Sequence, residues 1–401
     1  MKKIVIAGGG ISGLAARYFL SKAHPGAEIV LYEKGSRLGG CIESVDAPYF
    51  FERGPRTFKA SRCPELLDLI KELGLEGELL PSTKEAGKRY LWKDQKLQKV
   101  GALLLPAWKS LLGEWCRPPF AGDETIGAFA RRRFGDYVAE TFFDPITLGV
   151  FAGDSEQLSV EACFPELKAM ERTHGSITRA LLKREKKKKP QGLFTLQGGI
   201  ETLIDRLVEK GRGPIHLNHL LEGFEGDHTI LALPAEGAKR FFEGDFEALR
   251  FFEGVGSVNL VVVNVVFSKK VFPKEGFGYL VPTKEKEKIL GVVFDSSIFP
   301  AQNRGEESRF TVMLREGGEI EALEALQTHL GVSALPSSVH VKEYKGAVPQ
   351  YGVGHLERVK AFEAHLAKYY PQVDCIGNYL RGPSVNACVA QGARLRIKKT
   401  Q

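Results

Sequence analysis

The first forty residues carry a glycine pattern that few folds other than a dinucleotide-binding βαβ unit can accommodate. A short run rich in β-branched residues, Lys2 to Ala7, leads directly into Gly8-x-Gly10-x-x-Gly13. The segment Ser12 to Leu20 has a helical pattern, and Glu28 to Glu33 has the pattern of a second strand ending in an acid. Glycines at this spacing let the backbone turn tightly and approach a pyrophosphate at the helix N-terminus.

The acid at the end of the second strand strengthens this interpretation. Glu33 follows Gly13 by about 20 residues, where an acid can bind the ribose hydroxyls of an adenosine. A glycine-rich turn without a ligand is the simpler alternative, but the strand, helix and acid around the glycines argue against it. We therefore predict that a dinucleotide contacts Gly8, Gly10, Ile11, Ser12, Gly13, Glu33 and Lys34.

The next residues indicate which dinucleotide binds. Arg37-Leu38-Gly39-Gly40 follows the ribose acid and resembles the FAD-binding signature of the flavin amine oxidase superfamily. A nicotinamide dehydrogenase does not need this motif. The resemblance therefore implies FAD as the cofactor, with Gly40 among the residues that bind it.

Composition limits the partners. The net charge of +7 suits an anionic substrate or an anionic membrane surface, and no P-loop, zinc-finger or RNP-like motif points to nucleic acid. The six cysteines form no CxxC pair, and the chain starts directly with a strand pattern rather than a signal peptide. We therefore expect free thiols in the cytoplasm. His216 and His219 have no third ligand nearby, so we predict no metal.

Two segments leave a choice between packing and membrane contact. Gly101 to Trp115 places leucines and tryptophans on one side of a helix interrupted near Pro106. Packing in the core is the simpler interpretation, and a helix lying in the inner face of the cytoplasmic membrane is the alternative. Lys183 to Lys189 is read as a solvated loop, or as a segment resting on anionic lipid. No run is long enough to span a bilayer.

The order of the patterns predicts an α/β fold of three parts. A second dinucleotide-type segment, Phe194 to Ile200, leads into a helix at Glu201 to Lys210, with strands at Ile215 to Leu221 and His228 to Leu233. We expect a Rossmann-like FAD-binding domain built from residues 1–80, 190–244 and 345–401. A mixed-sheet substrate domain would take 81–100 and 245–344, and a helical inserted domain 101–189.

Further motifs follow in order over nearly the whole chain, and together they resemble the protoporphyrinogen oxidase family. The main ones are Phe51 to Phe58 (FERGPRTF), Leu148 to Asp154, Phe277 to Pro282, Ser296 to Pro300, Val348 to Tyr351, Gly377 to Tyr379 and Ser384 to Val389. Tyr344, Pro383 and Ala387 depart from the residues that are common in that family.

The resemblance implies an oxygen-dependent FAD enzyme of haem biosynthesis. It would oxidise protoporphyrinogen IX to protoporphyrin IX and form hydrogen peroxide, with coproporphyrinogen III as the alternative substrate. It leaves open a handover of the product to ferrochelatase and a homo-oligomer. The rival interpretations are another flavin oxidoreductase, such as an amine oxidase or phytoene desaturase, and a porphyrin carrier without activity.

The resemblance also assigns residues to substrate and cofactor. Arg56 would hold a substrate carboxylate, Leu280 and Ile298 would form apolar walls, and Gly149 would leave room for the macrocycle. Besides the residues above, the flavin contacts would come from Gly54, Pro55, Arg56, Thr57, Leu221, Tyr344, Pro383, Ser384 and Val385. Arg53, Arg172 and Arg179 are further cations of unknown place. We nominate no catalytic acid or base, because a flavin itself takes the hydride.

Overall fold

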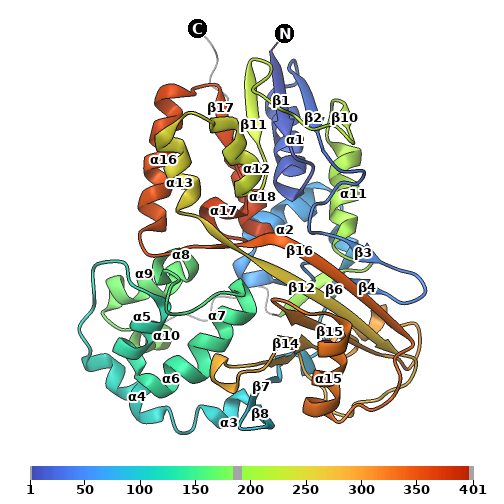
Figure 1. Cartoon of the computed structure of the whole chain (residues 1–401), viewed down its shortest axis with the longest axis vertical. Helices are drawn as coiled ribbons and strands as arrows, with labels where there is room; N and C mark the ends of the chain where they lie inside the picture. The colour runs from blue at the N-terminus through green and yellow to red at the C-terminus, as the bar shows by residue number, and fades with distance from the viewer. Residues whose placement is uncertain (1, 184–191, 397–401) are drawn as a thin grey trace.

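A parallel sheet of five strands, built from three distant stretches of the chain, forms one end of the molecule (Figure 1). The computed structural model describes residues 2–183 and 192–396. The sheet has the order β10-β2-β1-β11-β17, which is the 3-2-1-4-5 order of a doubly wound nucleotide-binding fold. Its strands are β1 (Lys3–Ala7), β2 (Glu28–Tyr32), β10 (Ile215–His216), β11 (His228–Leu231) and β17 (Val373–Cys375). The predicted α/β class is confirmed.

Alternation along β1 divides the surrounding helices into two layers. Ile4 and Ile6 are buried in one core, and Val5 and Ala7 are buried in the other, because successive side chains of a strand point to opposite faces. The first core is shared with α1 (Ile11–Ala23), α2 (Pro64–Glu72), α11 (Glu201–Lys210) and α18 (Val385–Arg394). The second is shared with α12 (Ala235–Lys239), α13 (Phe246–Glu253), α16 (His355–Tyr369) and α17 (Asn378–Arg381).

Two expectations for this part are wrong. The strand before α11, β9 (Leu193–Leu196), does not join the parallel sheet but pairs with β5 (Phe58–Lys59) and β6 (Leu79–Pro81) in a separate small sheet. The strand expected at Ile215 to Leu221 stops at His216, because the chain then turns so that His219 packs its ring on Tyr32 and Leu221 becomes buried.

A second sheet of seven strands, in the order β16-β12-β15-β14-β13-β7-β8, lies in the lower half of Figure 1, and its strands β12 and β16 reach the middle of the molecule. The predicted boundary between residues 344 and 345 falls inside its edge strand β16. The strands are β7 (Arg89–Lys93), β8 (Lys96–Lys99), β12 (Gly256–Phe267), β13 (Gly278–Leu280), β14 (Ile289–Val293), β15 (Ser308–Leu314) and β16 (Ser338–Gln350).

The two faces of this sheet have different chemistry. One face carries Tyr90, Tyr279 and Val312, which are buried against the helix α15 (Glu319–Leu330). Alternation then places a second set of side chains on the face toward the parallel sheet and the helical part. This set comprises Arg89, Asn264, Leu280, Thr311 and Met313.

A group of short helices occupies residues 100 to 183. They are α3 (Val100–Leu103), α4 (Trp108–Gly113), α5 (Ile126–Phe134), α6 (Asp136–Val138), α7 (Asp144–Phe151), α8 (Val160–Cys163), α9 (Pro165–His174) and α10 (Ile177–Lys183). A fully buried ion pair between Arg133 and Glu114 ties the turn after α4 to α5. Glu114 also accepts hydrogen bonds from the backbone N–H of Ile177 and Thr178, which ties that turn to α10.

The core-packing interpretation of residues 101 to 115 is wrong for most of its large side chains. Leu103 is buried, but Leu105 is 74%, Trp108 55% and Leu112 59% exposed. The chain breaks between α3 and α4 around Pro106, as expected. Within the residues described, no helix has both the length and the apolar character needed to cross a bilayer. Of the basic run, Lys183 ends α10 and the other residues lie outside the described part.

Candidate functional site

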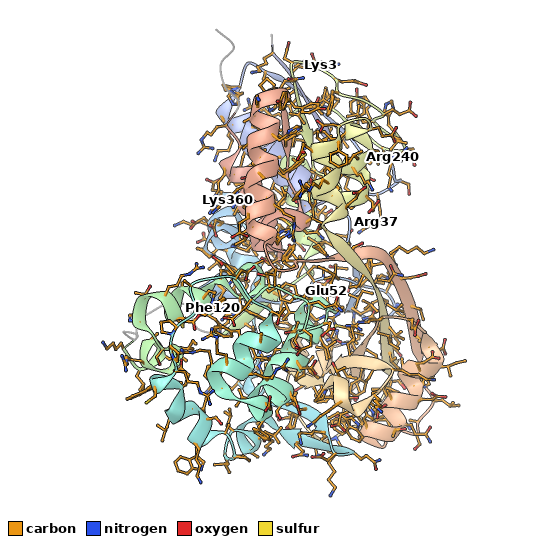
Figure 2. The ribbon with its side chains drawn as sticks, turned by 60° about the vertical axis from the view of Figure 1, so that its left-hand side comes forward. Lys3, Arg37, Glu52, Phe120, Arg240 and Lys360 are labelled. Atoms are coloured by element: carbon orange, nitrogen blue, oxygen red, sulfur yellow. The ribbon has the colours of Figure 1, made fainter. Side chains whose placement is uncertain are left out.

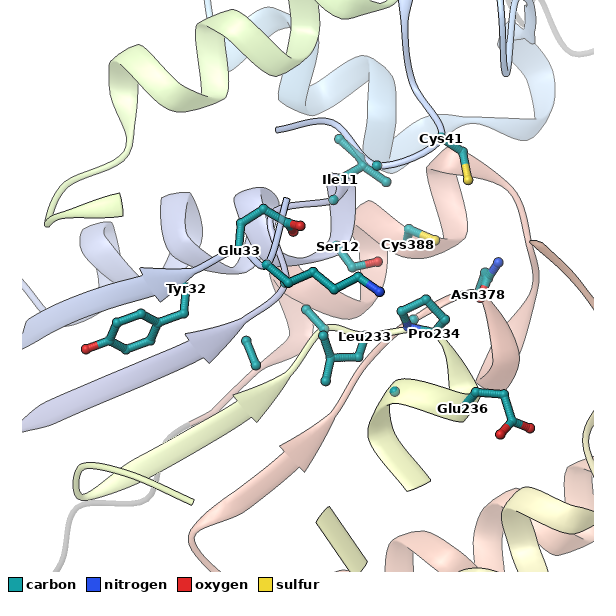
Figure 3. Close-up of a pocket in the computed structure, with 18 of the residues that line it drawn as sticks. Ile11, Ser12, Tyr32, Glu33, Cys41, Leu233, Pro234, Glu236, Asn378 and Cys388 are labelled. Atoms are coloured by element: carbon teal, nitrogen blue, oxygen red, sulfur yellow. The ribbon is translucent and has the colours of Figure 1, made fainter. Parts of the chain in front are cut away.

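A cleft of about 650 Å³ opens at the carboxyl ends of β1 and β11. Gly8, Gly10 and Ser12 line it from the β1 side, and Leu233 and Pro234 line it from the β11 side (Figure 3). This is the switch point of the sheet, where the strand order reverses and where doubly wound folds bind their ligands. Tyr32 and Glu33 lie at one end of the cleft, and Cys41 and Asn378 lie at the other.

The three glycines of the first turn serve different purposes. Gly13 allows close packing, because a Cβ there would lie 1.9 Å from the carbonyl oxygen of Gly8. Gly8 has φ +105°, and a Cβ on it would lie 2.4 Å from the Ala232 oxygen. A Cβ on Gly10 would meet no atom within 4 Å and would project into open space. Since Gly10 lines the cleft, its missing side chain leaves space that a pyrophosphate could occupy.

Glu33 is held rigidly at the cleft wall. Its Oε2 accepts a hydrogen bond from the Gly9 N–H at 2.7 Å, and its Oε1 accepts one from the Gly35 N–H at 2.7 Å. The Tyr32 ring beside it lies 4.6 Å from the His219 ring, and Leu221 is buried nearby in the same wall. An acid between aromatic and apolar side chains suits an adenosine, whose base has apolar ring faces and whose ribose donates hydrogen bonds.

The Arg37 side chain shapes the turn of the RxGG motif. Its Nη1 donates to the Gly40 oxygen at 2.7 Å, and its Nη2 donates to the Ile42 oxygen. The Gly39 N–H donates to the Gly9 oxygen at 2.9 Å, which joins this turn to the first one. Gly39 and Gly40 both have positive φ, the backbone region that glycine enters without strain.

The far end of the cleft is built on α17 and the Gly382 that follows it, and two buried rings anchor this segment. Tyr351 donates its hydroxyl to the Asn378 oxygen and accepts from the Gly382 N–H at 3.2 Å. His355 stacks on Tyr351 with ring centroids 4.4 Å apart, and its Nε2 lies 2.9 Å from the Leu380 oxygen. Burial lowers the pKa of His355 to about 4, so the neutral ring donates to this carbonyl.

The structure brings most of the predicted cofactor residues to the cleft and leaves others behind its walls. Those that line it are Gly8, Gly10, Ile11, Ser12, Glu33, Lys34, Gly40, Pro55, Leu221, Pro383 and Val385. Gly13 packs beneath the first turn, and the Ser384 side chain caps α18 by accepting from the Ala387 N–H. A Cβ on Gly54 would lie 1.8 Å from the Cys41 oxygen, so this glycine permits close backbone contact. Gly54, Arg56, Thr57 and Tyr344 do not line the cleft.

Arg56 joins the loop after β4 (Phe51–Glu52) to the second sheet. Its Nη1 donates to Asp295 Oδ1 at 2.8 Å and to Thr311 Oγ1 at 2.5 Å. Thr311 in turn donates to Asp295 Oδ2 at 2.7 Å. Asp295 begins the short helix α14 (Asp295–Ile298), and only 11% of the Arg56 side chain and 13% of the Asp295 side chain are exposed. The charge of Arg56 is therefore already balanced by a carboxylate of the protein.

Glu52 closes the same junction from the other side, and Figure 2 shows it at the centre of the molecule. Its Oε1 accepts from the Ile200 N–H at 2.8 Å, next to the start of α11, and its Oε2 accepts from the Ser44 hydroxyl at 2.8 Å. Burial raises the pKa of Glu52 to about 7, above that of an ordinary glutamate. Asn264 donates to the Glu52 backbone oxygen at 3.1 Å and to Thr311 Oγ1 at 2.8 Å.

The predicted substrate residues lie along the inner face of the second sheet. Gly149 on α7 and Leu280 on β13 are in direct contact, since a Cβ on Gly149 would lie 2.5 Å from Leu280 Cδ2. The Leu280 side chain therefore fills the space beside Gly149, which was expected to be open for a macrocycle. Ile298 is fully buried at the end of α14, in a cluster that includes Phe277. These three residues belong to distant segments, and the fold places all of them on one side of the sheet.

Arg89 is a cation that sequence reasoning missed. It is exposed on the same sheet face as Leu280, and its guanidinium lies 4.5 Å from the centre of the Phe277 ring. Among the residues described, it forms no ion pair with an acid. The signal was the alternation of Arg89 to Lys93, in which Tyr90 and Trp92 take the buried face.

The other candidate cations lie elsewhere or are paired. They are Arg53, which pairs with Glu43 at 2.5 Å, Arg172, which pairs with Glu161 at 2.7 Å, and Arg179, which lies over Trp115.

Comparison with known proteins agrees with this geometry. Residues 11–332 match the family described as flavin containing amine oxidoreductase. Protoporphyrinogen oxidase of Bos taurus is 32% identical, with 100% of this chain and 99% of the relative covered. The human protoporphyrinogen oxidase is also 32% identical, covering 99% and 98%. Coproporphyrinogen III oxidase of Bacillus subtilis is 27% identical, covering 98% and 96%.

Solved structures share the fold. A structure from Exiguobacterium sp. 255-15, assigned as a protoporphyrinogen oxidase, superposes with a TM-score of 0.86 at 23% identity and covers 98% of this chain and 97% of its own. The cleft suits the flavin that this family contains. Gly10 leaves open space for a pyrophosphate, and Glu33, the acid expected to bind the ribose, is held beside it by the Gly9 N–H. The chain is therefore a flavin-containing oxidoreductase that belongs to the flavin containing amine oxidoreductase family, among its protoporphyrinogen oxidases.

Proposed function

We propose that this protein uses FAD to oxidise a porphyrinogen to the aromatic porphyrin, with oxygen as electron acceptor and hydrogen peroxide as product. The observation that carries the proposal is that the dinucleotide cleft and the inner face of the second sheet lie next to each other. Pro55 lines one end of the cleft, and the next residue, Arg56, donates a hydrogen bond to Thr311 on that face. A flavin at that end and a substrate on that face would be neighbours.

The residues divide the work. When bound, FAD supplies a two-electron acceptor that oxygen can reoxidise. The turns at Gly8 to Gly13 and Gly39 to Gly40 hold the dinucleotide, and Glu33 orients its adenosine end. Leu280 offers an apolar wall to the macrocycle, and the fully buried Ile298 packs behind the same face. Burial of apolar surface would otherwise drive the binding. These residues contribute to catalysis by holding the two reactants at a fixed distance.

The charges of the inner face favour protoporphyrinogen over coproporphyrinogen. Protoporphyrinogen carries two propionates, whereas coproporphyrinogen carries four. We infer that Arg89 binds one propionate directly, because no acid of the described residues neutralises it. Arg56 is the second candidate. It has no hydrogen bond from Nε or Nη2 to the described residues, although Asp295 shares its charge. Arg89 offers an unpaired charge and Arg56 offers free N–H donors, so two guanidinium groups are available to two carboxylates.

We also propose that the helical part rests on the inner face of the cytoplasmic membrane. The turn and helix around α4 expose an apolar patch made of Leu104, Leu105, Trp108, Leu112 and Trp115. The buried Arg133–Glu114 pair ties the turn beside Trp115 to α5. Apolar side chains with tryptophans suit the headgroup region of a bilayer. Handover to ferrochelatase and self-association stay predictions.

The cofactor assignment predicts different results for two glycines of one motif. Gly10→Ala should weaken FAD binding at least about tenfold and leave the stability of the apoprotein unchanged, because the new methyl group meets only the ligand. Gly13→Ala should instead destabilise the fold by about 1–3 kcal/mol through overpacking against Gly8. Fluorimetric FAD titration and thermal unfolding of the apoprotein measure the two effects. Equal losses of FAD affinity and stability in both variants would contradict the assignment.

The substrate assignment predicts a preference between two porphyrinogens. The purified FAD-loaded protein should generate porphyrin fluorescence faster from protoporphyrinogen than from coproporphyrinogen, and only in the presence of oxygen, because the two cations match two propionates. Initial rates measured in separate cuvettes, with autoxidation subtracted, test this. A clear preference for coproporphyrinogen would overturn the substrate choice. Porphyrin formation no faster than autoxidation, with FAD bound, would overturn the activity.

The two arginines should respond differently when they are removed. Arg89→Met should raise KM about tenfold and leave the melting temperature close to that of the wild type, because the side chain is exposed and has no acid partner. Arg56→Ala should raise KM and also lower stability by about 3–5 kcal/mol, since Asp295 loses its buried partner. Steady-state kinetics and thermal unfolding separate these effects. An unchanged KM for both variants would exclude them as carboxylate ligands.

The membrane proposal predicts a loss of lipid binding without a loss of activity in solution. Replacing both Trp108 and Leu112 by serine should reduce binding to anionic phospholipid vesicles in a sedimentation assay by about tenfold, because apolar area no longer enters the interface. Phe246→Ser is the matched control, since Phe246 is 74% exposed on a different part of the molecule. Equal vesicle binding by all three proteins would rule out the patch as the contact surface.

A further inference from the structure

The edge strand β16 leaves the regular ladder where it passes the cleft. Tyr344 pairs with Leu260 on β12, and Val348 pairs with Val258, so that three residues of β16 stand opposite the single residue Asn259. Gly346 sits in this bulge with φ +56°. Its N–H donates to Asn259 Oδ1 at 2.9 Å. Bulges of this kind redirect a side chain and are frequent next to active sites.

The first residue of the bulge is Lys345. Lys345 lines the cleft, whereas its neighbour Tyr344 does not. The bulge is fixed from the cleft side as well, because Asn378 Nδ2 donates to the Ala347 oxygen at 3.0 Å. Asn378 lies at the end of the cleft opposite Glu33 (Figure 3). Lys345 therefore belongs to the far end of the cleft.

Lys345 also differs in charge balance from the other lysine nearby on its strand. Lys342 lies 3.6 Å from Glu43 Oε2. Lys345 forms no ion pair with any acid of the described residues, and its side chain is exposed to the cleft. An unpaired ammonium in a ligand cleft suits an anionic part of the ligand.

We propose that Lys345 faces the isoalloxazine ring of FAD and stabilises the negative charge that this ring gains on reduction. The inference rests on the proposed cofactor. Glu33 fixes the adenosine end, so the ring system belongs at the end with Pro55, Asn378 and Lys345. A hydride carries two electrons and one proton, so its transfer from the substrate leaves the neutral ring with one negative charge. A nearby cation favours that product and so raises the reduction potential.

Sulfite tests the charge without any porphyrinogen, because its addition to an oxidised flavin also leaves a negative charge on the ring. In the FAD-loaded protein, Lys345→Met should raise the sulfite dissociation constant about tenfold or more. If Lys345→Met disfavours the reduced flavin tenfold relative to the oxidised flavin, the two-electron reduction potential of the bound FAD falls by about 30 mV. Redox titration of the FAD-loaded protein measures this potential. Lys345→Arg keeps the charge and should restore both values to within about twofold of the wild type.

Lys342→Met is the matched control, since it removes the same charge from the same strand outside the cleft. It should leave the sulfite affinity and the potential near the wild-type values. Should Lys345→Met lose its FAD, Lys345→Gln gives the same comparison with a polar side chain.

The outcomes separate this inference from the cofactor proposal. If Lys345→Met and Lys345→Gln both keep FAD and bind sulfite as tightly as the wild type, the role of Lys345 is overturned and the cofactor proposal stands. An equal weakening in Lys342→Met would overturn it too, because the effect would then be one of overall charge. Failure of the wild-type protein to bind FAD would overturn the cofactor and this inference together.

Discussion

The contact between the start of α1 and the turn after β1 is the constraint on which the site depends. A Cβ on Gly13 would stand 1.9 Å from the Gly8 oxygen, so only glycine lets the helix approach this closely. This approach directs the helix N-terminus, with its free N–H groups, at the carboxyl edge of the sheet. The Gly39 to Gly9 hydrogen bond and the two bonds to Glu33 then build the cleft around that edge.

The second constraint is the junction between the parallel sheet and the seven-stranded sheet. Arg56, Asp295, Thr311 and Asn264 form one hydrogen-bonded chain across it, and Glu52 anchors the same loop to α11. Buried ionic groups of this kind contribute little net stability, but they fix geometry, because every alternative arrangement leaves a charge unpaired. The end of the cleft and the inner face of the second sheet are thereby held together.

Patterns within short stretches of the sequence predicted the helices and turns that depend only on neighbouring residues. The helix at Glu201–Lys210 has the expected bounds, and the glycines and Glu33 stand where the motif places them. Pairing between distant segments was not predictable, which explains the errors for β9 and for the strand after Ile215. Lys345 was missed for the same reason, because it lies in a bulge that forms only against a partner strand. Arg89 could have been found from the alternation of its own strand, in which Tyr90 and Trp92 take the buried face.

The most direct test of the account is a mixing experiment without oxygen. The FAD-loaded protein is combined anaerobically with excess protoporphyrinogen while the flavin absorbance is followed, and oxygen is then admitted. The account predicts bleaching of the flavin by the porphyrinogen, followed by recovery of the yellow colour and formation of hydrogen peroxide when oxygen enters. A flavin that stays oxidised in the presence of the porphyrinogen would contradict it.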